Sequence, residues 1–406
     1  MSNLPRILVI RTYWHPAGTP GSRRLESFCR YLAEDGWDVT LVALRPPVKI
    51  EGADAPVPYR RIWLEHSIRA GSILSGLDYR ICKWFPGLFG DGYAEARIRV
   101  HRAASDLLKT EHFDCLLTTY RFAASLQVTD RLHRRFGVPW VADLRDLPDE
   151  FDAARNKWSI RRDAARLSAA CRSAAHITTV SGPLKHALET RYGLHVPVDV
   201  ICNGFDEEAF QVTDSPETSD TFDITFCGGA RRGDGRTAAL LGQGLALMKQ
   251  RGENLSGVRI VSVGASDTEA LSLGRAADLP VPFVHRGIVS HTEALNTICA
   301  SSILVSLASV GSEGILTSKV FEYARSSRPV LSIPCDHNAL DEFIDRARIG
   351  RACDTPEDVA AFLTGYLKAW RRDGRIPVSD ADQEVLAGFS RRGLARRLGE
   401  IIRSCC

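Results

Sequence analysis

The chain has 406 residues, and at roughly 100–200 residues per domain this length predicts two or three domains. Hydrophobic residues make up 44% and charged residues 25%, which excludes a largely disordered chain, a collagen-like fibre and a small disulfide-stapled scaffold. Lysine and arginine number 52 against 49 aspartate and glutamate, and this near balance argues against a dedicated nucleic-acid-binding protein.

The first half repeats a strand–helix pattern. Apolar runs predict strands at Arg6–Ile10, Trp37–Leu44, Phe113–Thr118, Pro139–Leu144, His176–Val180 and Val198–Cys202. Helices are expected at Ser22–Asp35, Ala123–Arg135, Asp163–Ser173 and Lys185–Tyr192. A run of such units implies a parallel sheet covered by helices. No signal peptide precedes the first strand, and the eleven cysteines are dispersed, so we expect a cytoplasmic protein with reduced thiols.

The second half restarts the pattern. Strands are predicted at Phe222–Cys227, Val258–Val263, Pro282–His285, Ile303–Ala308 and Pro329–Ile333, and the polar stretch Asn203–Asp220 predicts a linker. We therefore expect an α/β protein with two Rossmann-like, doubly wound domains, residues 1–204 and 205–385, facing each other across a cleft. Residues 386–406 are expected to form a final helix that crosses back to the first domain, because its apolar stripe needs a surface to bury.

One stretch without charge, Ala294–Ser312, has the length of a membrane span. It contains many serines and threonines, which makes it too polar for the core of a bilayer. Ser290 and Glu293 have the spacing of a capping box, so we expect a helix to begin there and a buried strand to follow.

The most informative segment is Gly311–Pro334, GSEGILTSKVFEYARSSRPVLSIP. Thr317 or Ser318 is placed to cap a helix whose free N–H groups and dipole favour an anion such as a diphosphate. Lys319 in the first turn opposes the dipole, and a nearby anion would explain it. Glu322 follows on the same face, where a carboxylate is able to accept both hydroxyls of a ribose. The alternative is an ordinary surface helix with an i,i+3 Lys–Glu pair.

This segment resembles the donor site of the family 4 glycosyltransferases of the GT-B fold, in which a Ser-Lys step begins a helix, a Glu-Tyr follows and a Pro-Val-Leu strand comes next. Ile177–Phe210, with Asn-Gly-Phe-Asp at Asn203–Asp206, resembles the passage between the family's domains. Val141–Pro148 (VADLRDLP) resembles an Asp-x-Arg-Asp segment of one branch, and Gly287–Ser290 resembles the loop that holds the nucleobase. The order and spacing of these segments make the resemblance specific.

The resemblance implies a retaining glycosyltransferase that moves a sugar from a nucleotide-sugar donor to a hydroxyl of a glycan, a lipid-linked sugar or a small metabolite. The implied catalytic residues are Lys319, Arg232 and Asp146. The implied donor-binding residues are Gly18, Gly21, Gly229, Arg231, Arg236, Gly287, Ile288, Glu313, Ser318 and Glu322. Arg231, Arg232 and Arg236 are alternatives for one role at the diphosphate, since a guanidinium binds phosphate through two hydrogen bonds. A solvated turn is the other interpretation of their loop.

The chain departs from the family after the strand Phe113–Thr118, where Thr119-Tyr120-Arg121 stands in place of a histidine. The polar group beside the reacting sugar is then expected from Tyr120, Arg121, Asp143 or Asp146. With His15 of the loop Tyr13–Gly21, the residues Tyr120, Arg121 and Asp143 form the expected acceptor side. That loop lacks a GxGxxG fingerprint, so nicotinamide binding is not expected.

No metal-ligand spacing stands out, and we expect no metal and no cofactor besides the nucleotide-sugar substrate. Asp380-Ala381-Asp382 resembles a DxD motif, but its polar surroundings are typical of a helix start. The aromatic stretch Ile81–Tyr93 either contacts a lipid-linked acceptor or the inner membrane surface, or packs on the first domain's core. Two other functions stay open: a nucleotide-sugar 2-epimerase of the same fold, and a non-catalytic partner that regulates a transferase.

Overall fold

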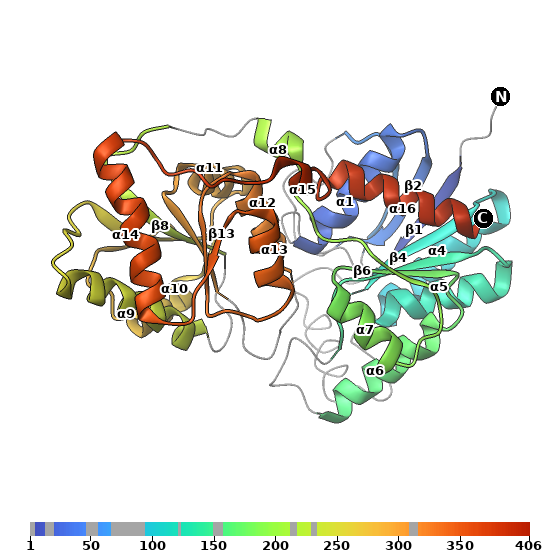
Figure 1. Cartoon of the computed structure of the whole chain (residues 1–406). Helices are drawn as coiled ribbons and strands as arrows, with labels where there is room; N and C mark the ends of the chain where they lie inside the picture. Colours follow the sequence, from blue (N-terminus) through green and yellow to red (C-terminus); the bar gives the residue numbers. More distant parts are fainter. Residues whose placement is uncertain are drawn as a thin grey trace. The chain divides into compact units, whose positions relative to one another are not determined.

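A computed structural model describes residues 5–12, 20–45, 56–65, 94–120, 123–148, 157–211, 217–228, 234–307 and 316–406. The chain divides into two compact units (Figure 1). The first comprises Met1–Cys202 together with Arg391–Cys406, and the second comprises Asn203–Ser390. Each unit is built on its own parallel sheet.

The first unit contains a seven-stranded sheet in the order β3-β2-β1-β4-β5-β6-β7. Its strands are β1 (Arg6–Arg11), β2 (Asp38–Leu44), β3 (Arg60–Leu64), β4 (Cys115–Tyr120), β5 (Trp140–Leu144), β6 (His176–Thr179) and β7 (Val198–Val200). The helices of this unit are α1 (Pro20–Glu34), α4 (Ala94–Thr110), α5 (Ala123–Phe136), α6 (Lys157–Cys171), α7 (Gly182–Thr190) and α16 (Arg391–Cys405).

The middle of this sheet is formed by β1, between β2 and β4, and residues Ile7–Ile10 have no solvent exposure. A strand covered on both faces must be apolar throughout, which is why RILVI reads as one continuous apolar run. The order of strands reverses between β1 and β4, and ligands of doubly wound sheets bind beyond the carboxyl ends of the strands at such a reversal.

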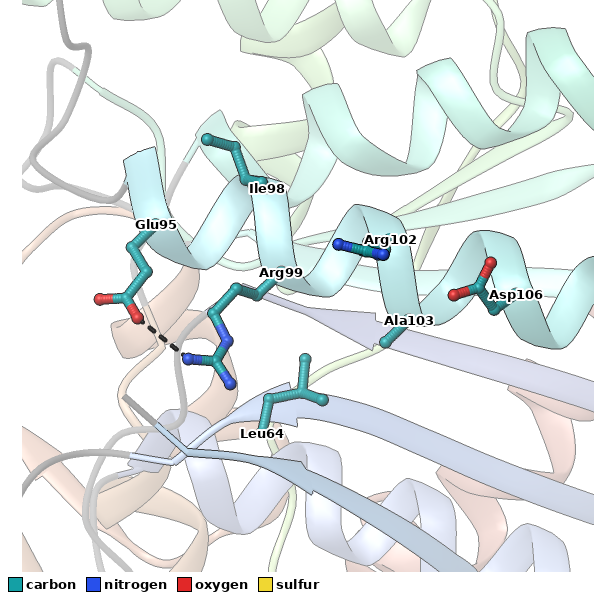
Figure 2. A pocket seen from close by; sticks show the side chains of 7 residues that line it. All are labelled: Leu64, Glu95, Ile98, Arg99, Arg102, Ala103 and Asp106. Carbon is teal, nitrogen blue, oxygen red and sulfur yellow. Dashed lines mark hydrogen bonds and ion pairs between the residues drawn. The ribbon is translucent and has the colours of Figure 1, made fainter. Parts of the chain in front are cut away.

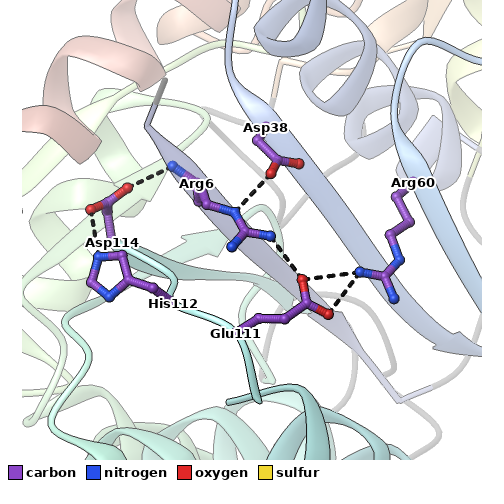
Figure 3. Close-up of polar contacts among 6 residues, drawn as sticks. All are labelled: Arg6, Asp38, Arg60, Glu111, His112 and Asp114. Atoms are coloured by element: carbon purple, nitrogen blue, oxygen red, sulfur yellow. Dashed lines mark hydrogen bonds and ion pairs between the residues drawn. The ribbon is translucent and has the colours of Figure 1, made fainter. Parts of the chain in front are cut away.

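The opposite, amino-terminal edge of the first sheet is closed by an ion-pair network (Figure 3). Arg6 at the start of β1 bonds Asp38 at 2.7 Å and Glu111 at 2.8 Å, and Glu111 also accepts from Arg60 at 2.9 Å. The backbone N–H of Arg6 donates to Asp114 at 2.6 Å. These contacts link the starts of β1, β2 and β3 to the turn before β4.

The final helix, α16, belongs to the first unit and packs along α1. Its buried stripe is Leu394, Leu398 and Ile402, and a Cβ on Gly399 would lie 3.2 Å from Leu32. Two ion pairs flank this contact, Arg392 with Glu34 at 2.6 Å and Arg396 with Asp35 at 3.0 Å. An amphipathic helix with a charged outer face therefore buries its apolar stripe on another helix.

The second unit contains a six-stranded sheet in the order β10-β9-β8-β11-β12-β13. Its strands are β8 (Phe222–Cys227), β9 (Val258–Val263), β10 (Phe283–His285), β11 (Ile303–Leu307), β12 (Val330–Ile333) and β13 (Gly350–Ala352). Its helices are α8 (Glu207–Gln211), α9 (Asp234–Gln250), α10 (Asp267–Ala277), α11 (His291–Ala300), α12 (Ser318–Arg325), α13 (Ala339–Ala347), α14 (Pro356–Asp373) and α15 (Gln383–Ala387).

The predicted doubly wound sheets are confirmed, and so is the helix start at the capping box of Ser290 and Glu293. The uncharged stretch that follows contains α11 and β11. Across the described residues, no helix combines the length and hydrophobicity that crossing a lipid bilayer requires. The sequence did not reveal the outer strands β3 and β13, because each carries exposed arginine in place of an apolar run.

Candidate active site

Three glycine turns end neighbouring strands at the carboxyl edge of the second sheet. Gly228 after β8, Gly264 after β9 and Gly287 after β10 have φ of 87°, 79° and 69°, which favour glycine. The N–H of Gly228 donates to Val263 at 2.6 Å, and the N–H of Gly264 donates to Gly287 at 2.7 Å. A Cβ on Gly264 would lie 3.3 Å from the backbone of Gly228. This edge therefore presents bare backbone that a ligand is able to approach closely.

Lys319 lies over the first of these turns. A Cβ on Gly228 would stand 2.6 Å from the Nζ atom of Lys319, so the ammonium group rests against the bare α-carbon. Hydrogen bonds from Ser266 lower the pKa of Glu269, and the positive charge of Lys319 lowers it further. The ammonium group therefore acts on the start of α10 as well as on the end of β8.

Helix α12 begins beside this lysine. Thr317 occupies the N-cap position with extended dihedrals, but its side chain makes no capping hydrogen bond, and the first turn contains no acidic residue. The preceding helices α10 and α11 both close their starts with complete capping boxes. Ser318 is the first residue of α12. The N–H groups that are predicted to face an anion therefore belong to a first turn without a side-chain capping hydrogen bond.

Glu322 is buried on α12, with 7% of its surface exposed. Its Oε1 lies 3.0 Å from Nε2 of His291, the first residue of α11. The next residue, Tyr323, accepts a hydrogen bond from the N–H of Cys227 at 3.1 Å, which ties α12 to the end of β8. Sequence reasoning missed His291, although it directly follows the capping serine of α11. Ile288, by contrast, is 80% exposed after the Gly287 turn and is open to an apolar ligand face.

In the first unit, Asp143 lies inside the core. Arg24 of α1 donates to both of its oxygens, at 2.8 and 3.1 Å, and Thr178 and Thr119 donate at 2.9 and 3.2 Å. Burial acts to raise the pKa of Asp143, but the charges of Arg24 and Arg145 and the hydrogen bonds outweigh it and hold the pKa below its usual value. With 1% of its surface exposed, Asp143 has a structural position, and its expected contact with an acceptor is not supported.

Other predicted residues of the first unit do gather at the carboxyl edge of its sheet. Tyr120 ends β4, and Asp146 follows β5 with its Oδ2 3.7 Å from Nη2 of Arg145. The guanidinium of Arg145 packs against Gly21 of α1, where a Cβ would lie 2.5 Å from Nη2. The absence of a side chain at Gly21 therefore makes room for a buried arginine, which the sequence did not reveal.

Several predicted residues lie outside the described part of the chain. They are His15, Gly18, Arg121, Gly229, Arg231, Arg232 and Glu313, and the aromatic stretch Ile81–Tyr93 lies outside it too. Arg236 lies within α9, whose first residues are described by their backbone alone. The sequence expectations for these residues stay predictions.

A groove of about 660 Å³ lies between β3 and α4 of the first unit (Figure 2). Both charged and apolar side chains line it, and these are Leu64, Glu95, Ile98, Arg99, Arg102, Ala103 and Asp106. Glu95 and Arg99 pair across one helical turn at 3.3 Å. None of the predicted site residues lines it.

The Asp-Ala-Asp sequence has a structural explanation. Asp382 caps α15 by accepting from the N–H groups of Glu384 and Val385. Arg348 lies 3.6 Å from Asp380 and 3.8 Å from Asp382. The predicted helix start is confirmed.

Comparisons with known proteins agree with this architecture. Residues 21–209 match the model of the family described as Glycosyltransferase Family 4. None of the curated proteins matches the chain.

Solved structures are similar over nearly the whole length of the chain. Sucrose-phosphate synthase from Thermosynechococcus elongatus has a TM-score of 0.64 at 16% identity and covers 99% of both chains. Anabaena HepE in complex with UDP and glucose has a TM-score of 0.66 at 13% identity, covering 98% of this chain and 100% of its own. A UDP-forming α,α-trehalose-phosphate synthase from Burkholderia vietnamiensis has a TM-score of 0.60 at 10% identity, covering 98% and 100%. At these identities the likeness establishes the fold.

Proposed function

We propose that this chain is a glycosyltransferase, because residues 21–209 match the Glycosyltransferase Family 4 model and the whole chain has the fold of the solved transferases. It holds a nucleotide-sugar donor at the carboxyl edge of the second sheet. The observation that carries this placement is the ammonium group of Lys319 over the bare α-carbon of Gly228, beside the start of α12. A diphosphate fits this arrangement, because it needs backbone N–H groups, a positive charge and close approach to the main chain. The UDP complex of HepE, which has the same fold, supports a nucleotide as the ligand.

The roles within the donor site follow from position. Glu322 accepts the ribose hydroxyls, and His291 fixes its carboxylate from α11. Gly287 and Ile288 face the base, since the glycine turn leaves the backbone accessible and the isoleucine is exposed. The family resemblance implies a second positive charge at the diphosphate from Arg231, Arg232 or Arg236, and donor contacts from Gly229 and Glu313.

Transfer with retention breaks the bond between the anomeric carbon and the diphosphate oxygen while the acceptor hydroxyl attacks from the same face, and the hydroxyl proton passes to the departing diphosphate oxygen. Negative charge grows on the leaving diphosphate, so Lys319 and the first turn of α12 stabilise the transition state more than the bound donor. In this proposal these groups act in place of a metal ion at the diphosphate. On the first unit, Tyr120 and Asp146 are described residues that supply polar groups beside the reacting sugar, and Arg145 lies against both Asp146 and Gly21, the glycine expected on the donor side.

A donor screen tests this proposal. Thermal-shift measurements with UDP-, GDP-, dTDP- and ADP-linked sugars are expected to show stabilisation by one base class, and Glu322→Gln is expected to reduce that shift at the same donor concentration. Product analysis without acceptor then separates transfer from isomerisation. Failure of every donor to stabilise the chain, or formation of a 2-epimer from the donor alone, would contradict the proposal.

A further inference from the structure

Two loops at the carboxyl edge of the second sheet bring together a thiol, an imidazole and carboxylates. The loop from β12 to α13 carries Cys335, His337 and, in the first turn of α13, Asp341. The loop from β13 to α14 carries Asp354. Because β12 and β13 are paired in parallel, with Ser332 opposite Ala352, their carboxyl ends place the two loops side by side.

The three side chains of the first loop have the spacing of a coordination site. One ligand atom each from Cys335, His337 and Asp341 lies within 4.8 Å of the other two. Ligand atoms of a tetrahedral Zn²⁺ ion lie roughly 3.3–3.8 Å apart, given bonds of about 2.0–2.3 Å. A side-chain movement of about 1 Å is enough to reach this spacing, and the exposed ring of His337 is free of packing that would prevent it.

The surrounding backbone fixes these residues in place. Asp336 accepts hydrogen bonds from the N–H groups of Asn338, Leu340 and Asp341 at 2.9, 3.1 and 3.0 Å, which sets the start of α13. The N–H of His337 donates to Oδ2 of Asp341 at 2.8 Å.

Asp354 contacts the backbone of Cys335 and the side chain of His337. Its Oδ1 accepts the N–H of Cys335 at 2.8 Å, and its Oδ2 lies 3.3 Å from Nε2 of His337. A carboxylate against one ring nitrogen is the contact that orients metal-binding histidines.

One carboxylate oxygen of the cluster receives no hydrogen bond from an N–H or O–H group of the described residues, and its neighbour is the carboxyl group of Asp336. Oδ1 of Asp341 is buried and makes no hydrogen bond with any described residue. A buried carboxylate oxygen without a partner costs free energy, and a cation removes that cost.

We propose that Cys335, His337 and Asp341 bind one Zn²⁺ ion per chain, with Asp354 as a positioning residue and a fourth coordination position open to solvent. Sulfur, nitrogen and oxygen ligands together suit Zn²⁺, whereas Mg²⁺ and Ca²⁺ prefer oxygen alone. All three ligands lie on the β12–α13 loop and the first turn of α13, and Asp354 connects them to the β13–α14 loop through its contacts with Cys335 and His337. The site is separate from the proposed transfer reaction. Failure of the zinc proposal therefore does not contradict the proposed function, and the reverse also holds.

Metal titration of the tag-free, full-length chain tests the site. After treatment with a chelator, Zn²⁺ is added in competition with a chromophoric chelator, and Co²⁺ is used as a spectroscopic substitute. We expect one equivalent of Zn²⁺, a thiolate-to-cobalt absorption band, and a higher melting temperature with Zn²⁺. Mg²⁺ and Ca²⁺ should produce none of these changes.

Variants assign the ligands. Cys335→Ser is expected to remove the cobalt band, and His337→Ala, at an exposed side chain, to weaken Zn²⁺ binding at least tenfold. Asp354→Asn should weaken it about 10–100-fold while the sulfur band persists. The matched control is His112→Ala, since His112 and Asp114 form a similar exposed pair at 3.1 Å, with the Sγ atom of Cys406 3.4 Å from the carbonyl oxygen of Asp114. Cys406→Ser controls for an exposed thiol.

Three results would overturn the proposal. The first is the absence of stoichiometric Zn²⁺ binding to the wild-type chain. The second is binding that survives in Cys335→Ser and His337→Ala, both of which are checked by circular dichroism for native folding. The third is loss of binding in the His112→Ala control, which would place the metal elsewhere.

Discussion

Replacing Asp143 with asparagine tests whether this carboxylate holds the first unit together or meets a substrate. The side chains of Asp143 and Arg24 are each 2% exposed and lie 2.8 Å apart. Asparagine keeps the shape but leaves the guanidinium buried without a counter-charge, and removing one partner of a buried pair costs ~3–5 kcal/mol. Arg24 keeps its hydrogen bonds to the carbonyls of Ile201 and Cys202, at 2.8 and 2.6 Å, so we expect the lower end, about 3 kcal/mol.

Urea unfolding measures this loss, and Asp35→Asn is the control. Asp35 pairs with Arg396 at 3.0 Å on the surface, where the arginine is 60% exposed, and such pairs contribute roughly 0–1 kcal/mol. Asp143→Asn at permissive temperature should retain its kcat. If Asp143→Asn lowers the free energy of unfolding by less than about 1 kcal/mol and abolishes turnover, the structural role is refuted and Asp143 contacts the substrate.

The same carboxylate predicts a dependence on pH. Its pKa is lowered in the folded chain, because Arg24, Arg145 and Thr178 outweigh the effect of burial. A carboxyl group with a lowered pKa stabilises the fold above its unfolded pKa, and this stabilisation is lost as pH falls through the folded pKa. The difference in stability between wild type and Asp143→Asn should therefore shrink below about pH 4.

Two glycine substitutions probe the site through their neighbours. Gly228→Ala forces Lys319 off the turn, so turnover should fall at least tenfold. The control is Gly252→Ala, which has a similar φ of 81° with nothing within 4 Å and should share only the backbone strain of ~1–2 kcal/mol. Equal kinetics in the two variants would contradict a role of Lys319 in turnover. Gly21→Ala displaces the buried guanidinium that follows β5 and should raise the KM for acceptor severalfold, while Gly182→Ala, which also meets nothing within 4 Å, should match wild type in the same kinetic assay. An unchanged KM in Gly21→Ala would show that Arg145 does not contribute to acceptor binding.

The sequence predicted the centres of both sheets, because strands covered on both faces must be apolar, as in Ile7–Ile10. The outer strands β3 and β13 were missed, since half-covered strands tolerate arginine and lack that signal. Helix α12 was predicted from its N-cap candidates, whereas the donor-site roles of Lys319 and Glu322 came from the resemblance to the family.

What the sequence did not reveal depends on contacts between distant segments. His291 of α11 contacts Glu322 of α12, and Asp354 after β13 contacts His337 after β12. Neither pair can be predicted from the local spacing of residues in the sequence. Asp143 was predicted as a polar group beside the sugar, yet its partner Arg24 lies 119 residues earlier in the chain and holds it in the core. A charged residue is readily assigned a functional role from sequence. Whether its role is functional or structural depends on the residues that it contacts in the fold.

The central claim is that a nucleotide sugar binds at Lys319 and Glu322. Titration calorimetry and steady-state kinetics of Glu322→Gln and Lys319→Ala, on the donor that stabilises the wild type, test it most directly. Hydrogen bonds to a charged group contribute ~1.5–3 kcal/mol, so Glu322→Gln should weaken donor binding about tenfold to a hundredfold. Lys319→Ala should lower kcat about 10²–10³-fold with a smaller change in donor KM, because its charge acts mainly on the leaving diphosphate. Wild-type affinity and turnover in both variants would contradict the account and leave α12 a purely structural helix.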